Sequence, residues 1–325
     1  MPYAHRTFFR HLLSCVAVMF VCLAPSAYAE APMVKTQVPG YYRMMVGQFE
    51  VTALFDGALQ LDSKRLINGK RKDIEKLLSR SFSPTDKVQL SVNAYLINTG
   101  KQLVLVDVGG GSAYGAALGK LLPNLKAAGY EPEQVDVIIL THMHGDHIAG
   151  LVDRDNDRVF PNATVYAEEA ESQHWLSTAS EAKAPASWKR IFATARTSAA
   201  PYHQHGKWKT FTIGSELAPG INTIPARGHT PGHTIVTVES HNQRLLIVGD
   251  LMHSHAVQFA RPDVAFDFDV TSKQAIETRQ AIFKVLARGK TLTAATHLPF
   301  PGIGRLRAEG GGKYSWVPVE FAPIQ

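Results

Sequence analysis

The residues best suited to chemistry are histidines and aspartates in a short run, Thr-His-Met-His-Gly-Asp-His, at positions 141–147. In an extended segment, residues two apart point the same way, so His142 and His144 can bind one ion together. Beyond the glycine the chain turns, and Asp146 and His147 can then face a second ion. Imidazole and carboxylate groups suit zinc and similar divalent metals. The run therefore predicts a metal site rather than a solvated polar loop.

Three later segments offer further ligands. One is Gly-His-Thr-Pro-Gly-His, in which either His229 or His233 can complete the coordination of the first ion. The others are Asp250, which can bridge two cations through its two oxygens, and His297. Each alone is typical of a cap or a satisfied polar residue. Together they share one context, the end of a predicted strand, and that context favours a single dinuclear site.

The elements that must position these groups alternate along the chain, which predicts layered α/β structure in a single domain, residues 30–325. No repeat or linker marks a second domain. The predicted strands are Phe49–Leu54, Val88–Ile97, Leu103–Val108, Val135–Leu140, Thr164–Ala167, Ile221–Ile224, Thr234–Val238, Arg244–Val248 and Thr291–Ala295. The predicted helices are Tyr114–Ala128, interrupted at Pro123, then Glu168–Ser177, and Thr271–Arg288 with a capping box of Thr271 and Gln274.

The N-terminus predicts a secretory signal peptide over residues 1–29. Arg6 and Arg10 precede an apolar run, Leu12–Leu23, that is too short to span a bilayer, and Ala27–Ala29 is an A-x-A cleavage site. The alternative is a single membrane anchor. We expect a secreted or periplasmic protein without stable membrane insertion after cleavage. Both cysteines lie in this segment, so neither a disulfide framework nor a cysteine-based zinc site is expected.

Composition narrows the class of protein. The chain has 325 residues, of which 45% are hydrophobic and 19% charged, and this excludes wholesale disorder and a multi-span membrane protein. The net charge of +6 raises the question of nucleic acid. The densest basic patches, Lys64-Arg65 and Lys70–Lys72, have no interleaved aromatics, so they indicate a solvated surface. We expect no nucleic-acid partner, and a nuclease is a minor alternative.

The whole motif set resembles the metallo-β-lactamase superfamily, in its dinuclear hydrolase branch. The resemblance implies an αββα sandwich and two divalent ions, first of all zinc, with Mn²⁺, Co²⁺, Cd²⁺ or Fe²⁺ as alternatives. It also implies that Asp250 bridges the ions and that Asp107 and His233 support the site. The implied ligands are His142, His144 and His229 for one ion, and Asp146, His147 and His297 for the other.

Segments that lie mostly outside the metal motif resemble the methyl parathion hydrolases, a group of organophosphate hydrolases. They are Tyr41–Met44, Ala127–Tyr130, Glu133–Asp136, His297–Gly304 and Arg307–Gly310. This closer resemblance implies a homodimer and an aromatic substrate pocket of Tyr114, Trp175 and Phe192. Core packing is an equal alternative for Trp175 and Phe192. The chain departs from the pattern at Tyr114, where the group has Phe, and at Gly145, where it has Pro.

Two such ions lower the pKa of a shared water towards about 7, so a hydroxide held beside Asp250 and Asp146 would be the nucleophile. We expect attack on a small neutral substrate, in the first place an organophosphate triester with an aryl leaving group. A lactonase or aryl esterase, acting on dihydrocoumarin or an acyl homoserine lactone, is the alternative with the same site. An exported metal-binding protein without catalysis is the alternative from another class, and iron-dependent oxidation is less consistent with seven ligands.

Overall fold

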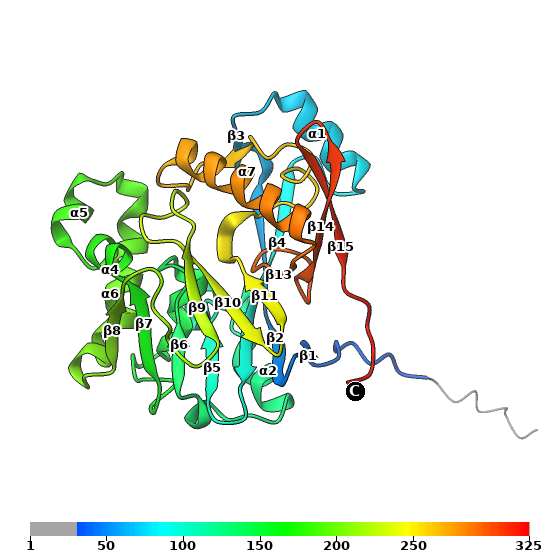
Figure 1. The fold of residues 1–325 in the computed structure, drawn as a ribbon. Coiled ribbons are helices and arrows are strands. Elements are labelled where there is room, and N and C mark those ends of the chain that lie inside the picture. Colours follow the sequence, from blue (N-terminus) through cyan, green and yellow to red (C-terminus); the bar gives the residue numbers. More distant parts are fainter. Residues whose placement is uncertain (1–30, 325) are drawn as a thin grey trace, which may run out of the picture. The chain divides into compact units, whose positions relative to one another are not determined.

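The computed structural model describes residues 31–324, and two β-sheets contain most of the strands in this part of the chain (Figure 1). The predicted signal peptide, residues 1–29, lies outside the described residues. The first sheet has the order β1 (Tyr41–Val46), β2 (Phe49–Asp62), β4 (Lys87–Asn98), β5 (Leu103–Val106), β6 (Val137–Ile139), β7 (Thr164–Glu168), β8 (Trp208–Phe211). The second has the order β15 (Lys313–Pro318), β14 (Ile303–Gly310), β13 (Leu292–Ala294), β11 (Gln243–Ile247), β10 (Thr234–Ser240), β9 (Ile221–Pro225).

The central strands of the first sheet are buried on both faces because apolar side chains alternate between two cores. In β5, Leu105 packs in the core on the helical side of the sheet, whereas Val104 and Val106 pack in the core shared with the second sheet. In β6, Ile138 and Ile139 divide in the same way. A strand with such neighbours shows a continuous apolar run in the sequence, and the expectation for Val135–Leu140 is confirmed on this point.

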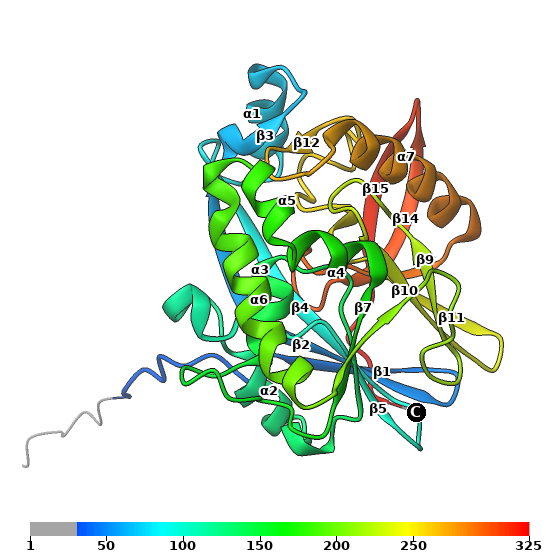
Figure 2. The same cartoon turned by 90° about the vertical axis from the view of Figure 1, so that its left-hand side faces the viewer.

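Helices cover the outer face of each sheet (Figure 2). Phe192 and Tyr202 of α6 pack in the core on the outer side of the first sheet. Phe283 and Leu286 of α7 pack against the second sheet. The layers are therefore helix, sheet, sheet, helix, and the predicted αββα sandwich is confirmed. The α-helices are α1 (Arg71–Arg80), α2 (Leu121–Ala127), α3 (Gly145–Ile148), α4 (Glu169–Trp175), α5 (Thr178–Lys183), α6 (Lys189–Gln204) and α7 (Ser272–Gly289).

A short strand pair, β3 (Leu66–Ile67) with β12 (Ala265–Phe266), packs with α1 in a further small core. Among the described residues, no helix is long and apolar enough to cross a membrane.

The helix predicted over 114–128 forms only in its second half, as α2, and the interruption lies before Leu121 rather than at Pro123. A 3₁₀ segment, Gly111–Ala117, is kinked at Gly115, with φ 58°, and is separated from α2 by a break at Gly119, with φ 92°. The buried Asp56 carboxylate accepts hydrogen bonds from the backbone N–H groups of Gly119 and Leu121, which holds the break open. Pro123 lies in the first turn of α2, where a missing N–H costs nothing.

The capping box predicted for α7 is also absent. Thr271 is the N-cap residue, but its side chain makes no capping hydrogen bond. The helix ends at Gly289, as expected, and the residue in the left-handed conformation is Lys290, with φ 48°. The helix thus lies where the apolar spacing predicts it, but the residues at its two ends are capped differently from the prediction.

Candidate metal centre

Four side chains from three segments face one another in the first cluster. The Nε2 atom of His229 lies 3.2 Å from His142 Nε2 and 3.0 Å from His144 Nδ1. An oxygen of Asp250 lies 3.2 Å from the same His229 atom. All four donor atoms lie within 4.8 Å of one another, and all four residues are buried. We call His142, His144 and His229 the three-histidine group.

Asp146, His147 and His297 form the second cluster, which we call the Asp146 group. His297 Nε2 lies 3.5 Å from Asp146 Oδ2. Asp250 contacts this cluster as well, because its Oδ1 atom lies 3.1 Å from His147 Nε2 and its Oδ2 atom 3.0 Å from His297 Nε2. The structure thus brings all seven predicted ligands together, with Asp250 between the two groups.

The spacing of the donor atoms is better explained by bound divalent ions than by hydrogen bonds among the side chains. Zinc–nitrogen bonds of about 2.0–2.1 Å in a tetrahedron separate the ligand atoms by about 3.3 Å, close to the distances in the three-histidine group. Within the described residues, His147 Nε2 and Asp250 Oδ1 lie 3.1 Å apart, and both are buried without a hydrogen bond. Buried polar atoms are normally satisfied, so this arrangement indicates a place for cations.

The ligands meet because strands end beside one another. The 141–147 run follows β6 and enters α3, Asp250 follows β11, and His297 follows β13, which pairs in parallel with β11. Gly249 turns the chain into Asp250 at φ 51°. A Cβ atom there would lie 2.7 Å from His233 Nε2, so the turn requires glycine for its space as well as its conformation.

A carboxylate orients one histidine in each cluster. Asp107 Oδ2 lies 2.8 Å from His147 Nδ1, and the Thr141 N–H donates to the other oxygen of Asp107. Asp269 Oδ1 lies 2.7 Å from His229 Nδ1. Such contacts fix the tautomer and direct the opposite ring nitrogen to the metal. Sequence reasoning identified Asp107 but missed Asp269, which has no recognisable spacing to the motif.

His233 does not face the cluster. Its Nδ1 atom lies 2.9 Å from the carbonyl oxygen of Ala226, and its Nε2 atom accepts a hydrogen bond from the Asp250 N–H at 3.0 Å. Both ring nitrogens are thus occupied by backbone groups. The structure places His229 in the cluster and His233 behind it, where it holds the Asp250 turn.

Two further residues near the centre escaped sequence reasoning. Glu171, on α4, is fully buried and accepts the N–H of Met143, between two ligands, and the N–H of Gly232. His253 Nε2 lies 3.1 Å from Asp250 Oδ2, and His253 forms a third donor cluster with Asp250 and His297. The only sequence signal for His253 is its position three residues after Asp250.

The three predicted pocket residues occupy different surroundings. Trp175 is fully buried, packs edge-on against His144 at 5.2 Å between ring centroids, and donates its indole N–H to Glu171. Phe192 is fully buried beside Trp175. Tyr114 is partly exposed, and its hydroxyl lies 2.6 Å from where a Cβ atom on Gly145 would be. The structure thus separates a fully buried aromatic pair from one partly exposed tyrosine.

Burial and charge set the protonation of the donors. Burial lowers the pKa of His142 and His144 well below the usual range, which favours the neutral imidazoles that bind metals. Burial would also lower the pKa of His229, but Asp250 and Asp269 outweigh it and raise this pKa to about 9. Burial raises the pKa of Asp250, yet His147 and His297 hold it well below its usual range.

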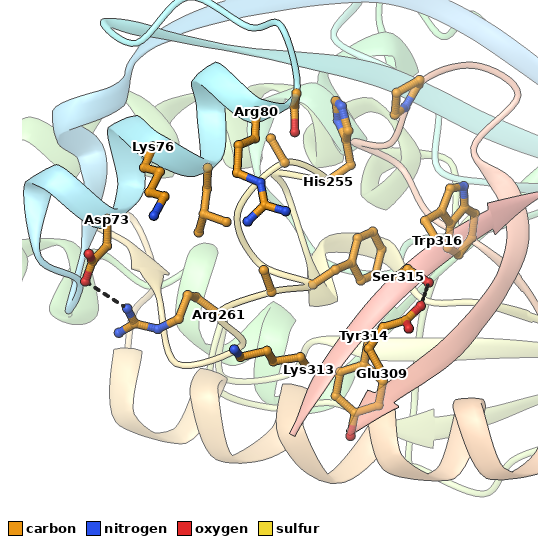
Figure 3. A pocket seen from close by; sticks show the side chains of 16 residues that line it. Asp73, Lys76, Arg80, His255, Arg261, Glu309, Lys313, Tyr314, Ser315 and Trp316 are labelled. Carbon is orange, nitrogen blue, oxygen red and sulfur yellow. Dashed lines mark hydrogen bonds and ion pairs between the residues drawn. The ribbon is translucent and has the colours of Figure 1, made fainter. Parts of the chain in front are cut away.

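A cavity of about 850 Å³ lies between α1, residues 255–261 and the β14–β15 hairpin (Figure 3). Lys76 and Arg80 line it, and Arg261 is 3.5 Å from Asp73 across it. None of the seven predicted ligands lines this cavity. We therefore assign the chemistry to the metal centre.

The sequence of residues 88–306 matches the profile of the metallo-beta-lactamase superfamily. The chain belongs to this superfamily. A hydrolase of the beta-lactamase superfamily called AbOPH is 38% identical, over 89% of this chain and 100% of that one, with a TM-score of 0.85. AidC, a dizinc quorum-quenching lactonase solved with an N-acyl homoserine product, is 29% identical over 87% of this chain and 99% of that one, with a TM-score of 0.81.

A curated relative, an N-acyl homoserine lactonase from Bacillus sp., is 25% identical over 50% of this chain and 64% of its own length. The chain thus spans somewhat less than two thirds of this relative. The two His/Asp clusters described above are consistent with the dinuclear metal site of the superfamily.

Proposed function

We propose that this protein is a dinuclear metal-dependent hydrolase of small neutral esters, with lactones and aryl esters as the first substrate class. The observation that supports it most directly is the position of Asp250, whose two oxygens contact both ligand clusters. The similarity to the dizinc lactonase AidC supports the lactone class.

Residues of this chain would bind the two ions and orient their ligands. When bound, two divalent ions lower the pKa of a shared water and polarise the oxygen of the bond under attack. Asp250 and Asp146 would provide oxygen ligands to the ions, and Asp250 contacts residues of both clusters. Asp107 and Asp269 keep His147 and His229 oriented by accepting from their distal nitrogens. No cysteine is present in residues 31–324 to act as an alternative nucleophile.

An organophosphate triester with an aryl leaving group is the second candidate. It is favoured by the segments outside the metal motif that resemble methyl parathion hydrolases, such as Tyr41–Met44 and His297–Gly304. Attack on phosphorus and on a carbonyl carbon need similar electrostatic stabilisation, so one centre can support both. We also propose export to the periplasm or cell exterior, as the N-terminal sequence predicts, and a homodimer, as the resemblance implies.

The test is kcat/KM for dihydrocoumarin, an acyl homoserine lactone, a p-nitrophenyl ester and methyl parathion, with metal analysis of the same preparation. We expect close to two metal ions per chain and the highest kcat/KM on a lactone or aryl ester. A strong preference for methyl parathion would move the triester to first place. Two bound ions without hydrolysis of any ester would instead indicate a metal-binding protein without catalysis.

A further inference from the structure

The Tyr114 side chain lies in a slot between two glycines. A Cβ atom on Gly110 would lie 2.7 Å from the Cδ2 atom of the Tyr114 ring, and a Cβ atom on Gly145 would lie 2.6 Å from the Tyr114 hydroxyl oxygen. The absence of both side chains therefore makes room for the phenol. Arg190 of α6 supports the segment by donating to the carbonyl oxygen of Ala113, and its guanidinium lies 5.9 Å from the Tyr114 ring centroid.

The slot places the hydroxyl beside Gly145, in the middle of the 141–147 ligand run. Gly145 separates His144, in one ligand cluster, from Asp146, in the other. Burial raises the pKa of the Tyr114 phenol, and the charges of Asp146 and Asp250 raise it further, so the hydroxyl keeps its proton. The hydroxyl makes no hydrogen bond to any group of residues 39–324, in contrast to the buried phenol of Tyr95, which donates to a backbone carbonyl. The slot therefore holds a hydroxyl without a protein partner beside Gly145, the residue between two ligands.

The two departures from the methyl parathion hydrolase pattern are thus one structural feature. Tyrosine at 114 needs space that a larger residue at 145 would occupy, and Gly145 leaves that space open. We propose, on the basis of the proposed function, that Tyr114 donates a hydrogen bond to the leaving-group oxygen of the substrate and adapts the centre to esters and lactones of aliphatic alcohols.

The leaving group explains why such a donor matters. In lactone hydrolysis the oxygen of water bonds to the carbonyl carbon, the ring C–O bond breaks, and its electron pair remains on the departing oxygen. That oxygen takes up the proton that the water loses, so the Tyr114 hydroxyl keeps its own. An aliphatic alkoxide concentrates its charge and gains from a donor, whereas p-nitrophenolate spreads its charge over the ring and gains little.

The test compares two six-membered lactones, δ-valerolactone with an alkoxide leaving group and dihydrocoumarin with a phenolate, and adds methyl parathion. For Tyr114→Phe we expect kcat/KM to fall about tenfold or more on δ-valerolactone, less on dihydrocoumarin, and within about twofold on methyl parathion, at unchanged metal content. Tyr166→Phe, which removes a hydroxyl on β7, is the matched control. Equal losses on both lactones, or none, would overturn the proposal.

Gly145→Ala tests the slot independently. The added Cβ should displace the hydroxyl and reproduce the selective loss on δ-valerolactone, and it should add little in a Tyr114→Phe background, because the hydroxyl is already gone. Additive losses would contradict the shared role. If the wild-type protein hydrolysed none of these substrates, the proposed function itself would be refuted. If the wild-type protein were active but the variants lost the same activity on every substrate, only the role of Tyr114 would be refuted.

Discussion

The two ligand clusters differ in chemistry and in access. The three-histidine group offers nitrogen donors from buried residues. The Asp146 group mixes nitrogen with oxygen, and the Asp146 side chain is 13% exposed, compared with 3% for Asp250 between the clusters. Burial and the neutral imidazoles of His142 and His144 favour firm retention of an ion, whereas the more open cluster can admit a substrate. We infer that the first ion is held more tightly and that the substrate approaches the second.

The largest expected effect comes from breaking the connection between the clusters. Asp250→Ala removes the carboxylate that contacts both groups, so we expect at most one tightly bound metal per chain and a fall in kcat/KM of about 10³-fold or more. Inductively coupled plasma mass spectrometry and kinetics on the best substrate measure both. Asp267→Ala, an exposed aspartate paired with Arg65, is the control. Two retained ions with full activity would refute the bridging role.

A matched pair of variants separates the clusters. Asp269→Asn removes the carboxylate behind His229 and should weaken the tighter ion, whereas Asp107→Asn removes the one behind His147 and should weaken the looser ion. Loss of such supporting carboxylates typically lowers metal affinity by about 10–100-fold. Stepwise titration of the metal-free protein with zinc resolves the two events. If both variants lowered the zinc affinity of the same binding step, the two groups would not be distinct ion sites.

A smaller effect on the same tighter ion is expected from Glu171. Its carboxylate accepts N–H groups from both loops of the three-histidine group, at Met143 and Gly232. In Glu171→Gln an amide N–H replaces one acceptor and faces a backbone donor, so the loops should separate slightly and zinc affinity should fall about tenfold or less. Glu169→Gln on the same helix is the control, since Glu169 is exposed and bonds only to Gln173. An equal change in both variants would exclude a specific role for Glu171.

Some site residues could be predicted from the sequence and others could not, and the reason is physical. Ligands such as His142 and Asp250 follow apolar strands, so a local pattern reveals them. Asp269 and Glu171 act through contacts with segments far away in the chain, and no local spacing marks either of them. His253 follows Asp250 closely, but nothing in its neighbours indicates that the loop returns it to the same carboxylate.

The fold shows the same limit. Strands buried on both faces, such as β6, were recognised from continuous apolar runs. The helix expected over 114–128 forms only from Leu121 on, because a distant carboxylate, Asp56, stabilises a break that glycines at positive φ permit. The long helix α6 was not predicted, and Pro201 within it is a residue that normally argues against a helix.

The smallest expected effect concerns the pH dependence of the metal-free protein. His229 has a pKa of about 9, above its usual 6.5, so its stabilising contribution is complete below pH 6.5 and disappears as the pH rises through 9. Burial lowers the pKa of His233 to about 3 and that of His253 to about 4, so these two cost stability as the pH falls below 6.5. The Tm of the metal-free protein should therefore be highest near pH 6.5.

Bound metal should remove the alkaline part of this profile. An ion takes the place of the proton on His229 Nε2, so the loaded protein should keep its Tm between pH 6.5 and 9 while the metal-free protein loses a few degrees. His229→Gln should flatten the metal-free profile over the same range, and His205→Gln, an exposed control, should not. The same alkaline decline with and without metal would mean that the proton and the ion do not share this nitrogen, and that the three-histidine group does not hold the tighter ion.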